Sequence, residues 1–355
     1  MKKTTWIIFI LYFGLFVALG AIFYFKYLNK FFKSGAEPMT VEQISSGSFI
    51  YYNIDNNLYR LWPVWTIDPQ AGDRIERFQS TGEVNSIDVS SNDDLVVYDA
   101  KTVNGSTEIW QVKTPSNESA NLAFIGQKGL DEFQNFTKPK ISPSGEEIAF
   151  IGVGNSDHII TFSTAKGFTI QTSKFASKIA DFAWTDTQAI VFCTQNMPKN
   201  ACYKIDIASG TDQKILEADV LQIAAAETGF VYLAKENETA NIYYQNLTNG
   251  KNRKLSDLQS PKKVDSFSLD KNQQKLAFKV SEGSNSYFYF ENVDGSNRFE
   301  LSGDGKNIMP LISPDGLQIA YLRPTDGIYI ENLDNQTIQK IANLSSTNVK
   351  LLLWR

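Results

Sequence analysis

The sequence predicts an all-β protein: a seven-bladed β-propeller, closed by its own C-terminal strand and preceded by one N-terminal transmembrane helix. Three observations predict this fold. An uncharged apolar run lies near the N-terminus, and a strand–turn–strand motif recurs along the rest of the chain. The last residues then read as a first strand with no blade after it. The motif returns at intervals of about 40–50 residues, which is the spacing of propeller blades.

The apolar run predicts the membrane helix. Residues 6–25, WIIFILYFGLFVALGAIFYF, carry no charge. A helix of about twenty residues is about 30 Å long, which matches the hydrocarbon core of a bilayer. We expect a short cytoplasmic tail over residues 1–5, a transmembrane helix over 6–28 and a linker over 29–40 before the propeller, residues 41–355.

A cleavable signal peptide is the alternative for this segment. Ala18, Leu19 and Gly20 offer small residues at a cleavage-like spacing. The apolar run continues past them through Phe25, whereas the apolar region of a signal peptide is shorter. This length favours an uncleaved anchor.

The repeat has two well-matched copies. Residues 139–150 read PKISPSGEEIAF and residues 310–321 read PLISPDGLQIAY. A proline fixes φ in each turn and a glycine accepts a positive φ, so the motif predicts two strands joined by a tight turn. The turn residues, to which we assign a structural role, are Ser142, Pro143 and Gly145 in the first copy and Ser313, Pro314, Asp315 and Gly316 in the second.

Weaker copies complete a set of seven. The second strand of each blade is expected to begin at Phe49, Val96, Ile148, Ile190, Phe230, Leu276 and Ile319. An apolar–aromatic pair follows most of these positions and predicts a third strand, and a short fourth strand follows a polar turn. Four short strands in each of seven units predict the propeller.

The two ends of the repeat region complement each other. The first blade lacks an obvious first strand, and residues 348–355, NVKLLLWR, form a strand pattern without a blade. Pairing the two closes the ring and removes the open sheet edge.

The Pro-x-Ile-Ser-Pro-Asp-Gly-x-x-Ile-Ala-Tyr pattern resembles the propeller repeat of TolB and of the wider group of WD-repeat-like propellers that lack the Trp-Asp dipeptide. The resemblance covers residues 41–355 as architecture and implies a fold rather than an activity. TolB propellers have six blades and a separate α/β domain, whereas this chain has seven units and an apolar segment.

Composition excludes several classes of function. The net charge is −5, and residues 1–33 contain five lysines and no acid, so the remainder carries −10. An acidic body argues against nucleic-acid binding. The single histidine, His158, excludes a site that needs two imidazoles, and two cysteines exclude a cysteine-rich zinc site. No catalytic residue, metal site or cofactor is predicted, and Ser156-Asp157-His158 is interpreted as a hairpin tip.

The two cysteines bracket one predicted hairpin. In AIVFCTQNMPKNACYKIDI, Phe192 would pair with Tyr203 and Val191 with Lys204, which places Cys193 opposite Cys202. We therefore predict a disulfide between them, which requires an oxidising compartment. Two buried thiols are the alternative.

Two aromatic residues fall outside the repeat period and are candidates for a binding surface. Phe133 and Phe136, in DEFQNFT, precede the first strand of their blade. In propellers this connection lies on the face where the channel opens. The alternative is that these rings pack over a neighbouring blade.

These features favour a non-catalytic protein- or peptide-binding platform, anchored in the cell membrane with its propeller on the extracytoplasmic side of the envelope. The expected partners are the membrane and a protein or peptide. A glycan or small-ligand receptor is the alternative, and a hydrolase-type propeller enzyme is a third.

Overall fold

The computed structural model describes the propeller. The described residues are 49–54, 57–61, 75–80, 82–113, 118–171, 178–195, 200–301, 308–323, 325–344, 346 and 349–354. The expected tail, membrane helix and linker, residues 1–40, lie outside them. Within the described ranges no helix is long and apolar enough to cross a membrane.

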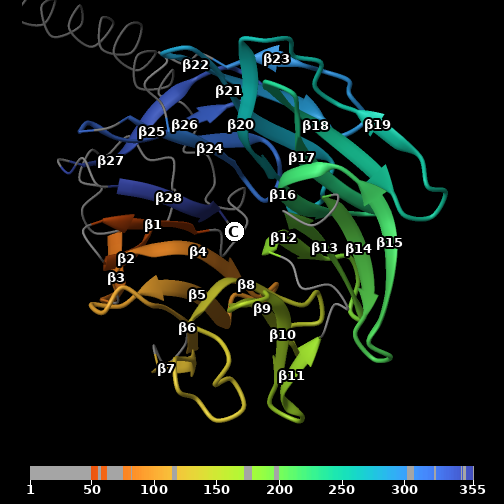
Figure 1. The fold of residues 1–355 in the computed structure, drawn as a ribbon. Coiled ribbons are helices and arrows are strands. Elements are labelled where there is room, and N and C mark those ends of the chain that lie inside the picture. The colour runs from red at the N-terminus through yellow and green to blue at the C-terminus, as the bar shows by residue number, and fades with distance from the viewer. Residues whose placement is uncertain are drawn as a thin grey trace, which may run out of the picture. The chain divides into compact units, whose positions relative to one another are not determined.

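Seven four-stranded antiparallel sheets form the blades of a ring (Figure 1). From the channel outward, blade 1 contains β28 (Val349–Trp354), β1 (Ile50–Ile54), β2 (Asn57–Leu61) and β3 (Ile75–Ser80). Blade 2 contains β4 (Val84–Val89), β5 (Leu95–Lys101), β6 (Thr107–Lys113) and β7 (Glu118–Ala123). Blade 3 contains β8 (Asn135–Ile141), β9 (Ile148–Val153), β10 (His158–Ser163) and β11 (Gly167–Gln171). Blade 4 contains β12 (Lys178–Trp184), β13 (Ala189–Gln195), β14 (Ala201–Asp206) and β15 (Thr211–Glu217).

The remaining three blades follow the same order. Blade 5 contains β16 (Asp219–Ala226), β17 (Gly229–Glu236), β18 (Thr239–Asn246) and β19 (Asn252–Lys254). Blade 6 contains β20 (Lys262–Leu269), β21 (Lys275–Glu282), β22 (Asn285–Asn292) and β23 (Phe299–Glu300). Blade 7 contains β24 (Ile308–Ile312), β25 (Gln318–Arg323), β26 (Gly327–Asn332) and β27 (Ile338–Asn343). The seven predicted second strands are confirmed, each within one residue of its expected start.

The C-terminal strand closes the ring, as predicted. β28 pairs antiparallel with β1, from Ile50 opposite Trp354 to Ile54 opposite Val349. β28 therefore occupies the innermost position of a blade whose other strands come from the start of the propeller. This pairing joins residues that lie about 300 positions apart in the sequence and gives blade 1 its four strands.

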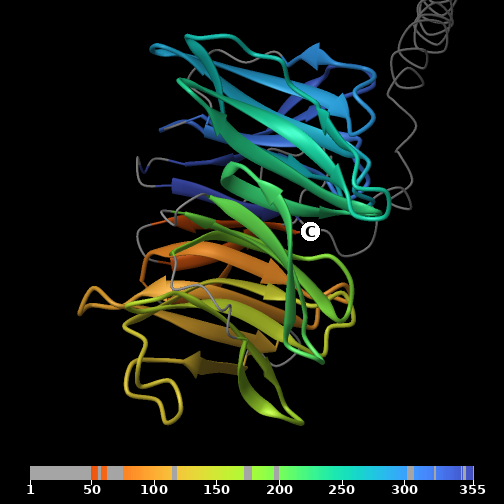
Figure 2. The ribbon, with the colours of Figure 1, turned by 45° about the vertical axis from the view of Figure 1, so that its right-hand side comes forward.

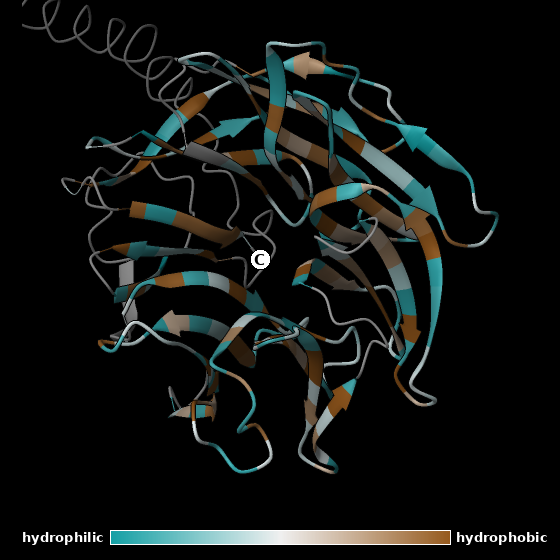
Figure 3. Cartoon of the chain, in the orientation of Figure 1, coloured by the Kyte–Doolittle hydropathy of each residue, from teal (hydrophilic) through white to brown (hydrophobic). Residues whose placement is uncertain are grey.

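The blades share a core pattern. Hydrophobic and hydrophilic residues alternate along many strands (Figure 3), as expected where side chains point to opposite faces of a sheet. In five blades an aromatic residue of the second strand stacks on one of the third strand, with ring centroids 5.1–5.8 Å apart. The stacked pairs are Tyr52/Tyr59, Phe192/Tyr203, Tyr232/Tyr243, Phe278/Tyr289 and Tyr321/Tyr329.

The inner strands are joined by side chains that bind the backbone of the next blade. Every inner strand is bulged where it pairs with the second strand. A bulge turns side chains out of simple alternation. Backbone N–H groups of the following blade are accepted by Asp88 (from Ile141, 2.8 Å), Asp181 (Ile223, 3.0 Å), Gln222 (Phe267, 3.1 Å) and Ser268 (Ile312, 3.2 Å).

Both copies of the repeat motif form the predicted tight turn. Gly145 has φ 79° and its N–H donates to the Ser142 carbonyl at 2.9 Å. Gly316 has φ 69° and makes the same bond to Ser313. The hydroxyl of each serine accepts a backbone N–H from the start of the second strand, at Glu147 and Gln318. The motif is therefore structural in both blades.

The ring has two faces with different connections. On the terminal face the first strand of a blade turns into the second and the third into the fourth; Phe49 and Trp354 also lie there. On the hairpin face the second strand turns into the third, and one blade connects to the next. Lys271 crosses the terminal face, where its ammonium donates to the Ser91 carbonyl of blade 2 at 3.5 Å.

The carboxylate of Asp99 provides a test of how the blades are held together. Asp99 is buried and accepts the backbone N–H groups of Asn85 (3.0 Å) and Ser86 (2.8 Å), the Ser86 hydroxyl (2.8 Å) and, in the next blade, the N–H of Lys138 (2.9 Å). In Asp99→Asn an amide donor would face backbone donors. We expect a loss of about 2–4 kcal/mol in the free energy of unfolding, measured by denaturant titration. Asp94→Asn, on an exposed turn, is the control; equal stability of the two variants would contradict this role.

Candidate binding site

The structure corrects the prediction for Phe133 and Phe136. Both rings are buried, 2% and 0% exposed, in a core between blades 2 and 3. Their ring centroids lie 6.0 Å apart, and Phe136 packs edge-on against Phe150. Phe133 lies in the connection before β8 and Phe136 lies on β8, and both rings pack over the neighbouring blade. These two aromatic residues therefore offer no binding surface.

The other residues singled out in the sequence make contacts within the fold. Cys193 and Cys202 lie opposite each other in the predicted register and are joined by a disulfide. Asp157 accepts the N–H of Ile179 at 3.1 Å and pairs with Lys178 at 3.0 Å, both in blade 4. His158 packs edge-on against Phe133. Ser156-Asp157-His158 is thus a hairpin connection fastened to the next blade.

A pocket of about 470 Å³ lies on the hairpin face, where blades 5 and 6 meet. Small-ligand sites have volumes of this order. Figures 1 and 2 show these two blades side by side. The residues that line the pocket are Leu221, Lys235, Asn237, Glu238, Thr239, Ala240, Lys263, Val264 and Asp265. They come from the start of β16, the β17–β18 hairpin and the start of β20.

The long β17–β18 hairpin makes one wall of this pocket. β17 and β18 have eight residues each and stay in register to Glu236 opposite Thr239. Asn237 and Glu238 form the connection, and Asn237 has φ 56°. Asparagine tolerates this left-handed conformation better than most residues, which suits it to a two-residue turn. The Thr239 hydroxyl donates to the Glu236 carbonyl at 3.1 Å and closes the turn.

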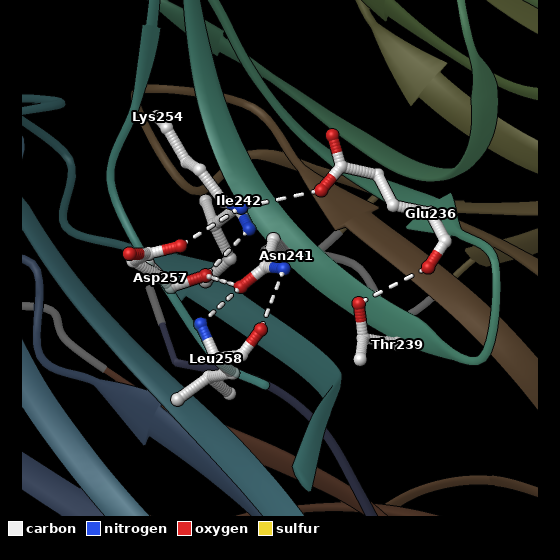
Figure 4. Close-up of polar contacts among 8 residues, drawn as sticks. Glu236, Thr239, Asn241, Ile242, Lys254, Asp257 and Leu258 are labelled. Carbon is white, nitrogen blue, oxygen red and sulfur yellow. Dashed lines mark hydrogen bonds and ion pairs between the residues drawn. The ribbon is translucent and has the colours of Figure 1, made fainter. Parts of the chain in front are cut away.

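A buried asparagine positions the chain that enters blade 6. Asn241 is fully buried on β18 (Figure 4). Its side-chain carbonyl accepts the Ser256 hydroxyl at 3.0 Å and the Leu258 N–H at 2.8 Å, and its amide donates to the Leu258 carbonyl at 3.3 Å. The Ser256 hydroxyl also accepts the N–H of Ile242 at 2.7 Å. These bonds fix the β19–β20 connection, and therefore the start of β20 with Lys263 and Asp265.

The charges around the pocket divide into paired and unpaired groups. Asp265 is paired with Lys279 at 3.5 Å and accepts the Ser281 hydroxyl at 2.9 Å. Among the described residues, Lys235, Lys263 and Glu238 have no partner. The pocket therefore holds two uncompensated ammonium groups and one uncompensated carboxylate, a local excess of positive charge in an acidic protein.

This pocket was not predicted from the sequence. The segment AKENETANI contains a turn signal between two apolar stretches, which could have indicated a tight hairpin. Nothing in the order of residues brings Lys235 of blade 5 next to Lys263 of blade 6. Within the described ranges, no group of three or more His, Cys, Asp or Glu side chains is placed to hold a metal ion.

A buried carboxylate lies between the outer parts of blades 5 and 6. Glu291 is 1% exposed, and its Oε2 lies 3.3 Å from Nε of Arg298. Burial raises the pKa of Glu291 to about 7, and the nearby charges of Arg298 and Arg253 lower it only in part. Arg253, on β19, donates to the Val293 and Asp294 carbonyls of blade 6 and so links the two blades.

Comparisons with known proteins identify the fold. No family model and no curated protein sequence matches this chain. Among solved structures, the chain is similar to TolB from Acinetobacter baumannii (TM-score 0.53, 14% identity, covering 73% of this chain and 64% of that one). It is also similar to a structure from a study of two prolyl endopeptidases (TM-score 0.62, 12% identity, covering 86% and 49%). An oligogalacturonate lyase in complex with manganese matches with a TM-score of 0.58 at 9% identity, over 74% of this chain and 77% of the lyase.

These similarities define a seven-bladed β-propeller with a TolB-like fold. The chain spans about two thirds of the TolB structure and about half of the prolyl endopeptidase structure. At these identities the likeness concerns the fold alone, and the neighbours include TolB as well as a prolyl endopeptidase and an oligogalacturonate lyase. The propeller domain of the Trilobed protease from Pyrococcus furiosus is described as having an open velcro topology, whereas β28 closes the ring here.

The raised pKa of Glu291 predicts how stability depends on pH. Between about pH 4.5 and 7 the folded protein retains a proton that the unfolded chain has released, so stability falls as the pH rises through this window. The difference amounts to roughly 2–3 kcal/mol. Glu291→Gln should remove this slope and be more stable than the wild type at pH 8, as measured by unfolding at pH 5, 6, 7 and 8. The exposed Glu146→Gln variant should keep the wild-type slope, and a slope unchanged in Glu291→Gln would contradict the assignment.

Proposed function

We propose that this protein is a single-pass membrane protein whose propeller lies on the extracytoplasmic side of the envelope and binds a protein or peptide without catalysis. The apolar run of residues 6–25 supports the anchor, and the Cys193–Cys202 disulfide supports an oxidising location. The TolB-like fold is compatible with this role and does not select it over others.

The observation that carries the binding proposal is the placement of exposed apolar side chains. The exposed large hydrophobic residues among the described ones are Val103, Phe124, Ile125, Leu221, Leu317 and Ile338. The first four lie at the hairpin face, which also contains the pocket. Phe49, the first described residue, lies on the terminal face, opposite these groups. Leu317 and Ile338 lie on the terminal face, so exposed apolar side chains are more numerous on the hairpin face, which supports the hairpin face as the interaction site.

A receptor for a glycan or small ligand is the second candidate. The pocket volume of about 470 Å³ and its polar lining favour this role over that of a flat scaffold. An enzyme of the prolyl endopeptidase or lyase type is a third possibility, because those proteins share the fold.

The location can be tested through the anchor and the disulfide together. Membranes should be isolated under an alkylating agent and washed at alkaline pH, and the protein then digested without reduction. We expect the protein to remain with the membranes, and Cys193 and Cys202 to be recovered as one linked peptide. A reduced sample alkylated at both positions is the control. Soluble protein would contradict the anchor, and two alkylated thiols would contradict the oxidising location.

The binding face can be tested by photo-crosslinking in native membranes. A photoreactive phenylalanine analogue at Glu238, on the hairpin face, should give a discrete crosslinked protein or peptide. The same analogue at Glu146, on the terminal face, should not. Crosslinking at both positions alike, or at Glu146 alone, would contradict the proposal. A purified partner that is recovered cleaved after incubation would show an enzyme instead.

A further inference from the structure

We propose that the pocket between blades 5 and 6 binds an acidic peptide, with a carboxylate held by Lys235 and Lys263 and a neighbouring aliphatic side chain placed against Leu221. This inference rests on the proposed function and specifies its partner.

The unpaired charges of the pocket are the reason for proposing a carboxylate ligand. Lys262, next in sequence to Lys263, pairs with Glu282 at 3.5 Å, and Lys254 pairs with Glu236 at 3.2 Å and Asp257 at 3.0 Å. Lys235 and Lys263 line one cavity and have no such partner among the described residues. A ligand carboxylate would supply the counter-charge to both ammonium groups. The Asp265 carboxylate repels the ligand carboxylate only weakly, because it is already paired with Lys279 and accepts a hydrogen bond from Ser281.

The apolar part of the pocket indicates the second half of the ligand. Leu221 is 41% exposed at the pocket, beside Ala240 and Val264, which are buried. When an aliphatic group of a ligand covers this exposed leucine side chain, apolar surface is removed from water and the complex is stabilised. A peptide with an acidic residue next to an aliphatic one supplies both contacts.

The same lining favours a peptide over an acidic glycan. Sugar rings are usually bound against the flat face of an aromatic side chain, and no aromatic residue lines this pocket. Its apolar contribution comes from Leu221, Ala240 and Val264, which suit a branched aliphatic side chain.

The pocket is prepared before a ligand arrives. The β17–β18 turn is closed by the Thr239–Glu236 bond, and Asn241 holds the connection that leads into β20. Lys235 and Lys263 therefore project from two fixed strand ends. Binding then orders the two lysine side chains and leaves the backbone in place, which limits the entropy cost.

The test uses the full-length protein in detergent micelles and a displayed library of random heptapeptides. We expect selection to enrich peptides with Asp or Glu beside Leu, Ile or Val. A synthetic peptide of the enriched sequence should bind at least tenfold more weakly to Lys235→Glu/Lys263→Glu, as measured by fluorescence anisotropy, because both counter-charges are reversed. Lys128→Glu/Lys251→Glu makes the same charge change at two exposed lysines whose ammonium groups have no partner among the described residues, and it should bind like the wild type.

A second variant should change the affinity for the acidic peptide in the opposite direction. Glu238→Gln removes the free carboxylate at the pocket and should tighten binding of the acidic peptide by roughly twofold to threefold, while thermal unfolding shows that each variant is folded.

Three other results would each overturn a different part of the proposal. Enriched peptides that bind all variants equally would overturn the pocket assignment and leave the proposed function standing. Trigalacturonate binding that is lost in Lys235→Glu/Lys263→Glu, without enriched peptides, would overturn the peptide in favour of an acidic glycan. No binding by either probe would overturn both this inference and the peptide-binding function.

Discussion

The pairing of β28 with β1 is the constraint on which the rest of the propeller depends. It places residues 349–354 at the centre of a blade built from residues 50–80, so the chain has one sheet that contains both ends of the ring. Without it, β1 would have an unpaired inner edge and the contacts of β28 with β4 and β24 would be absent. An exposed strand edge is prone to pair with another chain. Closure therefore supports solubility as well as stability, and it fixes the positions of both neighbouring blades.

Within the closed ring, blade-to-blade contacts depend on polar side chains as well as on the core. Asp88, Asp181, Gln222 and Ser268 each accept a backbone N–H of the next blade, and Asp99 does so from the second strand of its blade. The bulges in the inner strands explain how polar groups reach across these seams. A buried acceptor that meets a backbone donor is stabilising only when its geometry is satisfied. The ring is therefore held in register by directional bonds, whereas aliphatic clusters and the aromatic stacks within five blades supply the non-directional packing.

Blades 5 and 6 have the longest second and third strands of the seven blades. Their second and third strands have eight residues each and are joined by two-residue turns, so their hairpins extend further than those of blades 3 and 7, whose strands have six. The pocket lies between the long β17–β18 hairpin of blade 5 and the start of β20 in blade 6. The fold is shared with proteins of different activities, so the function has to be argued from this site rather than from the propeller.

The sequence by itself determined the repeat, the number of blades, the positions of the second strands and the tight turns at Ser142–Gly145 and Ser313–Gly316. It also determined the register that brings Cys193 opposite Cys202. These features depend on residues close together in the chain, where alternation of apolar residues and turn chemistry decide the backbone. Only the tertiary structure decided that Phe133 and Phe136 are buried, because an aromatic residue before or at the start of an inner strand is covered or exposed according to the neighbouring blade. It alone brought Lys235 and Lys263 into one pocket, since they belong to different blades and their proximity depends on how blade 6 packs against blade 5.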